Sequence, residues 1–425
     1  MPQVAFSVDQ SKSMRDQDVP GHNRWHPDIP AVASVRPGDE FRLECRDWTD
    51  AQIGNNDSAN DVRDIDLTLP HMLSGPVAIE GAEPGDLLVV DILDIGPVPQ
   101  QTGPQQTGPQ QTRDVPGQGW GYTGVFAKVN GGGFLTDHFP DAYKAVWDFH
   151  GVQTTSRHLP GVRFTGITHP GLFGTAPSED LLATWNRRER ALIDTDPQRV
   201  PPLGLPPEPG NALAGTATGE VADRIAREGA RTVPPRENGG NQDIKNFTRG
   251  ARVLCPVFVK DAKLSAGDLH YSQGDGEITF CGAIEMGGFI DFHVDLVKGG
   301  MEKYGVTTNP VFMPGNVKPR YSEFMSFIGI SVDHDSGTNH YLDATVAYRR
   351  ACLNAIEYLK KWGYTGEQAY LLLGSAPIEG RISGIVDIPN ACCSLYIPTA
   401  IFDFDVRPGA AGPVAKDRGQ CAVTS

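Results

Sequence analysis

The sequence lacks the features that would place it in a membrane or with nucleic acid. Its 425 residues contain no apolar run near the roughly 20 residues that a membrane helix needs, because runs such as 87–95 are interrupted by Asp. No basic stripe is present, since 37 Lys and Arg stand against 52 Asp and Glu, a net charge of −15. The N-terminal residues also lack a basic start followed by an apolar run, so no secretion signal is predicted. We therefore expect a cytoplasmic globular protein with neither a membrane nor a nucleic-acid partner.

Several catalytic signatures are missing as well. The seven cysteines form no C-x-x-C pair of the kind that marks zinc or redox sites. No G-x-S-x-G elbow occurs, which argues against an α/β-hydrolase. The glycine-rich stretch 117–126 is not followed by the Lys-Ser/Thr pair of a phosphate loop. Nucleotides are therefore not expected as ligands, and we predict no organic cofactor.

Glycine and proline are abundant instead. The 49 glycines and 34 prolines make up close to a fifth of the chain, against about 12% in an average protein. They separate short runs that are rich in β-branched and aromatic residues, a pattern typical of strands. The predicted strands are 41–48, 87–95, 252–259, 277–284, 289–297, 325–332 and 396–406. The pattern favours a mainly β (α+β) fold with a β-sandwich or barrel-like core and a few helices.

One long helix is predicted near 341–362. Its apolar residues recur at steps of three and four, Asp343 lies in the first turn, and Lys360, Lys361 and Gly363 follow at the end. A second helix is predicted near 218–229, and 187–190 lies on a third.

Composition also suggests how the chain is divided. Residues 1–199 form an N-terminal β-rich part with a mobile Gln/Thr/Gly/Pro loop at 100–112. A Pro-rich segment at 200–210 opens the part 200–425, which carries the main polar cluster and the long helix. We expect the two parts to form one intertwined catalytic unit.

The densest polar region lies between residues 238 and 285. It combines the imidazole of His270 with carboxylates and with glycines that permit close backbone approach. Imidazole and carboxylates are the ingredients of a metal site. The carboxylates are Asp243, Asp268, Asp275, Glu277 and Glu285. The alternative is that Asp275-Gly276 is an ordinary hairpin turn, and both interpretations can hold together because hairpin ends often carry function.

A second cluster occupies residues 146–178. It includes His150, His158 and His169, and its glycine-rich loops at 169–171 and 174–177 could present N–H groups to an oxyanion. The alternative is a strand and turn with structural, hydrogen-bonded imidazoles. A third polar patch, at 331–341, is also explained as the cap before the long helix.

Several blocks in this order resemble the acetamidase/formamidase family. They are EGAEPGDLLVVDILDI at 80–95, GITHPGLFGTAPS at 166–178, GGNQDIKN at 239–246 and GDLHYSQGDGE at 267–277. The likeness extends from HNRWHPDIP at 22–30 to SLYIPTAIFDFDVRP at 394–408, and it is strongest to the longer formamidase branch of bacteria and fungi.

The resemblance implies a β-rich homo-oligomer, a trimer or hexamer. It also implies hydrolysis of formamide, and more weakly of other short aliphatic amides, to the carboxylate and ammonia in nitrogen metabolism. Shorter family members are associated with a divalent metal, so a zinc ion, or second to it calcium, is expected. Those members have His where this chain has Asn238, so a ligand found there in relatives is missing or replaced.

Site residues follow from the matched blocks. Carried over by resemblance, Asp243, His270 and Glu285 hold the metal or orient an attacking water, and Glu277 or Asp275 passes a proton to the leaving ammonia. The expected substrate-binding residues are Asn241, Gln273, His169, Gly174 and Thr175.

Two alternatives differ from this mechanism. One is a covalent amidase with Cys255, Cys281 or Cys392 as the thiolate nucleophile. The other is a non-catalytic protein that binds a small amide or a metal.

Overall fold

The computed structural model describes residues 2–97, 118–195 and 208–425. The loop predicted at 100–112, most of the Pro-rich segment 200–210 and the predicted division at 199/200 lie outside the described residues. Within those ranges, no helix combines the length and apolar character needed to cross a membrane.

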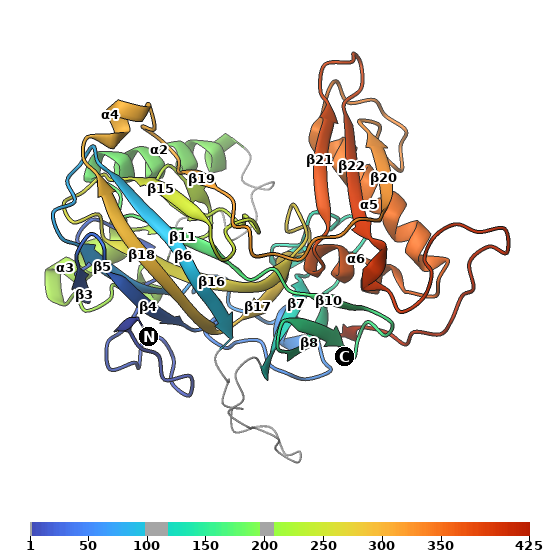
Figure 1. Cartoon of the computed structure of the whole chain (residues 1–425), viewed down its shortest axis with the longest axis horizontal. Helices are drawn as coiled ribbons and strands as arrows, with labels where there is room; N and C mark the ends of the chain where they lie inside the picture. Colours follow the sequence, from blue (N-terminus) through green and yellow to red (C-terminus); the bar gives the residue numbers. More distant parts are fainter. Residues whose placement is uncertain (1, 98–117, 196–207) are drawn as a thin grey trace.

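Two large sheets form the main body of the molecule (Figure 1). In the smaller one, β18 carries the alternation predicted for 289–297: Ile290, Phe292 and Val294 are buried in the core. Asp291 points the other way and is also buried, because it forms an ion pair of 2.6 Å with Arg42. The strand order is β1 (Gln3–Phe6), β4 (Glu40–Cys45), β18 (Gly288–Val297), β6 (Leu87–Pro97), β15 (Arg252–Pro256) and β19 (Val311–Met313).

The larger sheet contains twelve described strands, drawn from both halves of the chain. Apolar side chains of both sheets belong to one buried cluster, so the sheets pack on each other as a sandwich. The main path runs β10 (Arg163–Thr165), β9 (Gln153–Ser156), β8 (Tyr143–His150), β7 (Gln118–Val125), β17 (Phe280–Met286), β16 (Leu264–Gln273), β11 (His169–Gly174), β14 (Gly239–Asn241) and β13 (Pro235–Arg236). Beside it lie β3 (Ala33–Val35), β5 (Leu73–Ile79) and β23 (Ala422–Val423), and β2 (Arg24–Trp25) pairs separately with β12 (Ala230–Arg231). The predicted mainly β fold with few helices is confirmed.

The helices lie around this body. The long predicted helix is α5 (Ala344–Lys360), which begins when the Asp343 carboxylate accepts hydrogen bonds from the N–H groups of Thr345 and Val346. The predicted second and third helices are α3 (Gly219–Glu228) and α2 (Glu179–Thr195). The other helical segments are α1 (Asn60–Arg63), α4 (Gly300–Tyr304), α6 (Gly366–Ser375), η1 (Lys128–Asn130), η3 (Pro209–Asn211) and η4 (Thr399–Ile401).

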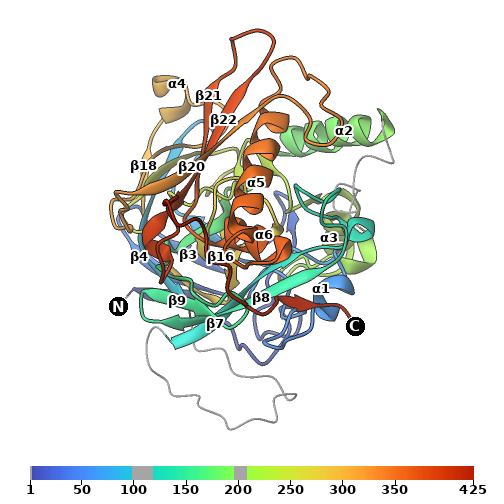
Figure 2. The same ribbon diagram turned by 90° about the vertical axis from the view of Figure 1, so that its right-hand side faces the viewer.

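The C-terminal part forms a lobe that stands out from the main body, coloured orange to red in Figure 1. Its three strands are β20 (Phe324–Ile330), β22 (Cys392–Pro398) and β21 (Glu379–Gly384), and α5 packs on them. The strand predicted at 396–406 ends at Pro398, where the chain turns into η4. Helix α6 joins the lobe to the body, since it packs against α5 and also against β7 and β17 (Figure 2).

Candidate active site

One row of paired residues crosses four strands of the larger sheet. His270 on β16 pairs with His169 on β11 and with Glu285 on β17, and Glu285 pairs in turn with Tyr122 on β7. Side chains directly opposite each other in an antiparallel sheet project from the same face. Asp268 lies two residues before His270, and its Oδ1 atom is 3.2 Å from His270 Nε2. Strand pairing thus brings an imidazole and two carboxylates together.

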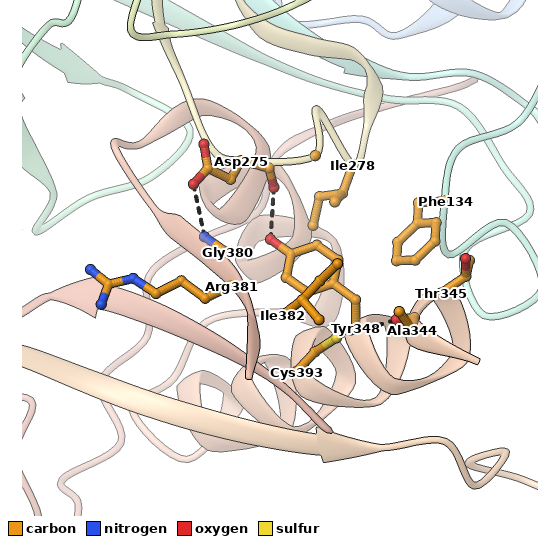
Figure 3. A pocket seen from close by; sticks show the side chains of 11 residues that line it. Phe134, Asp275, Ile278, Ala344, Thr345, Tyr348, Gly380, Arg381, Ile382 and Cys393 are labelled. Atoms are coloured by element: carbon orange, nitrogen blue, oxygen red, sulfur yellow. Dashed lines mark hydrogen bonds between the residues drawn. The ribbon is translucent and has the colours of Figure 1, made fainter. Parts of the chain in front are cut away.

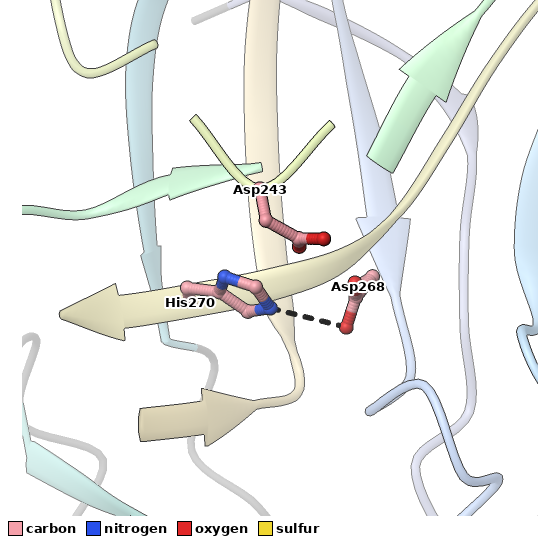
Figure 4. A group of neighbouring side chains, drawn as sticks. All are labelled: Asp243, Asp268 and His270. Carbon is pink, nitrogen blue, oxygen red and sulfur yellow. Dashed lines mark ion pairs between the residues drawn. The ribbon is translucent and has the colours of Figure 1, made fainter. Parts of the chain in front are cut away.

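Two turns add further carboxylates to this row. Asp243 follows β14, and Glu277 lies in the turn between β16 and β17. Ligand atoms of Asp243, Asp268 and His270 lie within 4.8 Å of one another, as do those of His270, Glu277 and Glu285. Figure 4 shows the side chains of the first trio directed toward a common point. We call these five residues the carboxylate–histidine cluster.

The backbone is strained where the cluster residues stand. Asp243, Asp268 and Glu277 have positive φ angles of 49°, 52° and 46°, and nearby Phe280 has 78°. Such angles are uncommon outside glycine and tend to mark functional positions, because surrounding structure must enforce them.

Burial disfavours the charged form of the carboxyl groups in the cluster. It raises the pKa of Asp243 to about 7 and that of Glu285 to about 8, and it raises the pKa of Glu277 well above its ordinary value. Burial also opposes the charge of Asp268 and of His270. Attraction to His270 nevertheless lowers the pKa of Asp268, and attraction to Glu285 and Asp268 raises that of His270. The cluster therefore retains protons at neutral pH unless a cation takes their place.

The tautomer of His270 follows from its neighbours. Gln273 donates from Nε2 to the carbonyl of Asp243 over 2.7 Å, which turns its Oε1 toward Nδ1 of His270, 2.9 Å away. In the neutral imidazole, the proton of His270 therefore sits on Nδ1, and Nε2 would offer its lone pair to a cation; without a cation Nε2 also carries a proton and faces the carboxylates. His169 lies behind this ring, with Nε2 2.9 Å from Gln273 Oε1. Gln273 and His169 thus orient His270 from behind.

The cluster has the properties of a cation site. Asp243 Oδ1, Asp268 Oδ1, Glu285 Oε2 and His270 Nε2 are buried, and no described residue outside the cluster forms a hydrogen bond with these atoms. Within the cluster, His270 Nε2 lies 3.2 Å from Asp268 Oδ1 and 3.1 Å from Glu285 Oε2. Gly171 leaves the space between them open, since a Cβ there would lie 2.5 Å from His270 Cε1 and 2.6 Å from Asp268 Oδ2. One imidazole with carboxylates suits zinc, and the carboxylate oxygens also suit calcium. The residues present therefore fit a divalent metal.

A very small pocket opens beside the cluster. Its volume is about 20 Å³, a little more than the about 10–15 Å³ that one water molecule requires. Trp48, His71, Val233 and Phe280 form its less polar wall, and Asn241, Asp268, Glu277 and Glu285 form its polar wall. Such a space accepts only a ligand of a few heavy atoms.

Four residues that line the pocket were not among the predicted site residues: Trp48, His71, Val233 and Phe280. His71 and Trp48 come from the N-terminal part, with ring centroids 4.9 Å apart, and His71 Nε2 is 3.8 Å from Asp268 Oδ2. No local pattern marks either residue. Asp268 was one of several candidate carboxylates, and its spacing of two from His270 on one strand was the signal that could have selected it.

A sequence-family comparison agrees with this geometry. The model of the Acetamidase/Formamidase family matches residues 7–404. The chain belongs to this family. The family predicted from the sequence blocks is therefore confirmed.

Individual relatives match this family member over most of their length. An acetamidase of Mycolicibacterium smegmatis is 75% identical over 89% of this chain and 91% of its own. A formamidase of Methylophilus methylotrophus is 62% identical over 96% of this chain and 95% of its own. The solved structure of a gamma lactamase from Delftia acidovorans is 56% identical, covers 100% of this chain and 99% of its own, and superposes with a TM-score of 0.92.

Three of the predicted site residues in this family member neither belong to the carboxylate–histidine cluster nor line its pocket or orient His270. The Asp275 carboxylate is bonded to Lys245 and to the N–H of Gly380. Gly174 pairs with Gly239 and Ser265 inside the sheet. The Thr175 N–H donates to Asn238 O over 3.3 Å and its hydroxyl to Pro256 O over 2.8 Å. The structure thus brings together Asn241, Asp243, His270, Glu277 and Glu285, with Gln273 and His169 behind them.

The candidate nucleophilic cysteines are poorly placed. Burial raises the pKa of Cys255 to about 12 and that of Cys281 well above its ordinary value, so both thiols stay protonated. Cys392 lies on β22 in the C-terminal lobe, where it pairs with Ile330 and Gly384. Neither Cys255 nor Cys392 lines the small pocket.

Proposed function

We propose that this family member hydrolyses short primary amides, with formamide as the preferred substrate and acetamide and other small amides following. The observation that carries the proposal is a pocket of about 20 Å³ bounded by carboxylic acids and served by a buried imidazole. The names of the two most similar relatives cited above, an acetamidase and a formamidase, support the same class of substrate.

Binding in this pocket is governed by size. Asn241 Oδ1 is buried, bonds to none of the described residues and is available to accept from the substrate amide N–H. Trp48, Val233 and Phe280 limit the length of the acyl group. Formamide has three heavy atoms, and since binding energy is capped near about −1.5 kcal/mol per atom, we expect a high KM.

Proton transfer falls to the carboxyl groups around the substrate. A water molecule attacks the amide carbon and gives its proton to Asp268, whose carboxylate is ionised beside His270. Glu277, which burial keeps protonated, donates its proton to the leaving nitrogen, and ammonia departs. Asp268 then returns its proton to Glu277 by way of Asp243, so atoms and charges balance over the cycle.

The cluster would also hold the metal expected for the family. Asp243, Asp268, His270 and Glu285 would bind it, so with the ion bound Asp243 and Asp268 would be ligands and would no longer carry protons, while Glu277 would remain the proton donor to the leaving nitrogen. A zinc or calcium ion there would polarise the substrate carbonyl and ease the ionisation of the attacking water.

An ammonia-release assay tests the proposal. We expect the fastest release from formamide, slower release from acetamide and the slowest release from propionamide, because the pocket is small. A chelator arm is expected to suppress activity and added zinc to restore it. Saturable amide binding without ammonia release would indicate the non-catalytic alternative, and inactivation by iodoacetamide would indicate the cysteine mechanism.

We further propose a cytoplasmic homo-oligomer, a trimer or hexamer. Support comes from apolar side chains exposed on the C-terminal lobe, where Ile328, Val386 and Ile388 are 63%, 73% and 70% exposed. All seven cysteines are free thiols, which fits a reducing compartment. Sedimentation velocity of wild-type protein and of Ile328→Lys tests the assembly, and a monomeric wild type would refute it.

A further inference from the structure

Asp275 connects three parts of the molecule although it lies outside the carboxylate–histidine cluster. Its Oδ1 atom is 2.9 Å from Nζ of Lys245, and its Oδ2 atom accepts from the N–H of Gly380 over 2.9 Å. Its carbonyl accepts from the Tyr348 hydroxyl over 2.7 Å (Figure 3). Lys245 follows β14, Gly380 is on β21 and Tyr348 is on α5. Asp275 thus connects its own turn to the turn that contains Lys245 and to the C-terminal lobe.

The two turns that meet here each carry a cluster carboxylate. Asp243 lies two residues before Lys245, and Glu277 lies two residues after Asp275, both with positive φ. Ligand atoms of both carboxyl groups lie within 4.8 Å of a ring nitrogen of His270. The Lys245–Asp275 ion pair therefore joins the turn that contains Asp243 to the turn that contains Glu277.

The turn with Glu277 borders an open pocket on its outer side. Gly276 and Ile278 line an open pocket of about 360 Å³ between this turn, α5 and β21 (Figure 3). Glu277, between them in the sequence, lines the small pocket. The turn thus lies between the two pockets. Because packing is interrupted on one side, its hydrogen bonds and its ion pair must hold it in place.

The Lys245 side chain is buried at this contact. The side chain is 7% exposed, its Nζ also donates to Ile378 O, and Asp275 N donates to the same carbonyl over 3.0 Å. A buried ammonium without its carboxylate is strongly unfavourable, so the pair persists only when both turns keep their relative position.

We propose that Lys245 and Asp275 are a pair of positioning residues, which set Asp243 and Glu277 at proton-transfer distance and make the C-terminal lobe part of the catalytic apparatus. This inference rests on the proposed amide hydrolysis. It assigns Asp275 to positioning, whereas the sequence placed it with the proton carriers.

Kinetics of Asp275→Asn, Lys245→Met and the double variant test the pair. Each single variant is expected to lower kcat on formamide by about 10- to 100-fold, since small misplacements of reacting groups have effects of that size. KM should change less than about threefold, because Trp48, Asn241 and Phe280 remain in the substrate pocket. The double variant should be no slower than the slower single variant, because one contact is lost in each case.

A second ion pair supplies the matched control. Arg42 and Asp291 join β4 and β18 in the other sheet, with Asp291 4% exposed, so Asp291→Asn also breaks a buried pair. This variant should keep kcat at temperatures well below its melting point. Equal loss of kcat in Asp291→Asn and Asp275→Asn would show that the effect comes from a general loss of stability, and would overturn the proposal.

Hydrogen–deuterium exchange tests, without any substrate, whether the Lys245–Asp275 ion pair holds the two turns together. Asp275→Asn is expected to speed exchange in residues 241–247 as well as in 274–280, whereas independent turns would change only in the mutated segment. Unchanged exchange in 241–247 overturns the positioning pair even if wild-type protein hydrolyses formamide. Faster exchange in 241–247, with no ammonia released by wild type, would instead support the link between the two turns and refute the proposed function.

Discussion

His270 and Glu285 are register partners on β16 and β17, and Nε2 of the imidazole lies 3.1 Å from Oε2 of the carboxylate. A one-residue slip between these strands would turn the two side chains to opposite faces. The candidate site therefore depends on one sheet register, and that register is held by a strand, β16, whose ten residues are all buried.

Gly171→Ala is expected to abolish metal binding and amide hydrolysis together. The added Cβ would lie 2.5 Å from His270 Cε1 and 2.8 Å from Asp243 Oδ1, and therefore occupy the space between the donor atoms. Metal content by mass spectrometry and ammonia release would both be measured. Gly210→Ala is the control, because a Cβ there meets no described atom within 4 Å. Full metal content in Gly171→Ala would contradict the assigned site.

Glu277→Gln is expected to lower kcat by about 10²- to 10⁴-fold, the usual contribution of one general acid or base. The amide keeps the shape of Glu277 but has no carboxyl proton to donate to the leaving nitrogen. Steady-state kinetics on formamide measure the effect, with the exposed Glu302→Gln as control. A loss confined to KM would show that Glu277 binds substrate and transfers no proton.

Phe280→Ala is expected to broaden the range of acyl groups. Phe280 lines the small pocket, so removal of its ring makes room for additional methylene groups. We expect kcat/KM for butyramide relative to formamide to rise by about 10-fold or more, the effect of one or two methylenes in an apolar pocket. Phe134→Ala serves as control, because Phe134 lines only the larger outer pocket. An unchanged ratio would remove Phe280 from the determinants of specificity.

His22 is expected to make the fold sensitive to mild acid. Burial lowers its pKa from 6.5 to about 4, with Nδ1 2.8 Å from Arg24 O and Nε2 2.8 Å from Ser265 Oγ. Below pH 6.5 the unfolded chain binds a proton that the folded chain does not, so stability is lost as the pH falls toward 4. Between pH 7.5 and 5 this amounts to about 2 kcal/mol.

Urea unfolding of wild type and His22→Gln at both pH values measures this contribution. The variant should show a smaller difference between the two pH values, while exposed His150→Gln should keep that of wild type. Equal pH dependence in wild type and His22→Gln would exclude His22 as the source.

Local pattern was sufficient for several elements. The alternation of residues 289–297 predicts the half-buried strand β18, because the side chains of a strand alternate between faces. Apolar spacing and capping residues predict α5 in the same way, with Asp343 at its start. The blocks around 239–246 and 267–277 also identify the family and contain Asp243, His270 and Glu277, and Glu285 follows eight residues after the second block.

Only the tertiary structure decided which of those groups meet. His71 and Trp48 enter the pocket from the N-terminal part through contacts that no local pattern encodes. Asp275 carries the same functional group as Glu277, yet the backbone of the turn directs it to Lys245 and away from the pocket. The reason is physical: local sequence determines which face of a strand a residue takes, whereas the pairing of distant strands and the conformation of turns are determined by burial of the whole core.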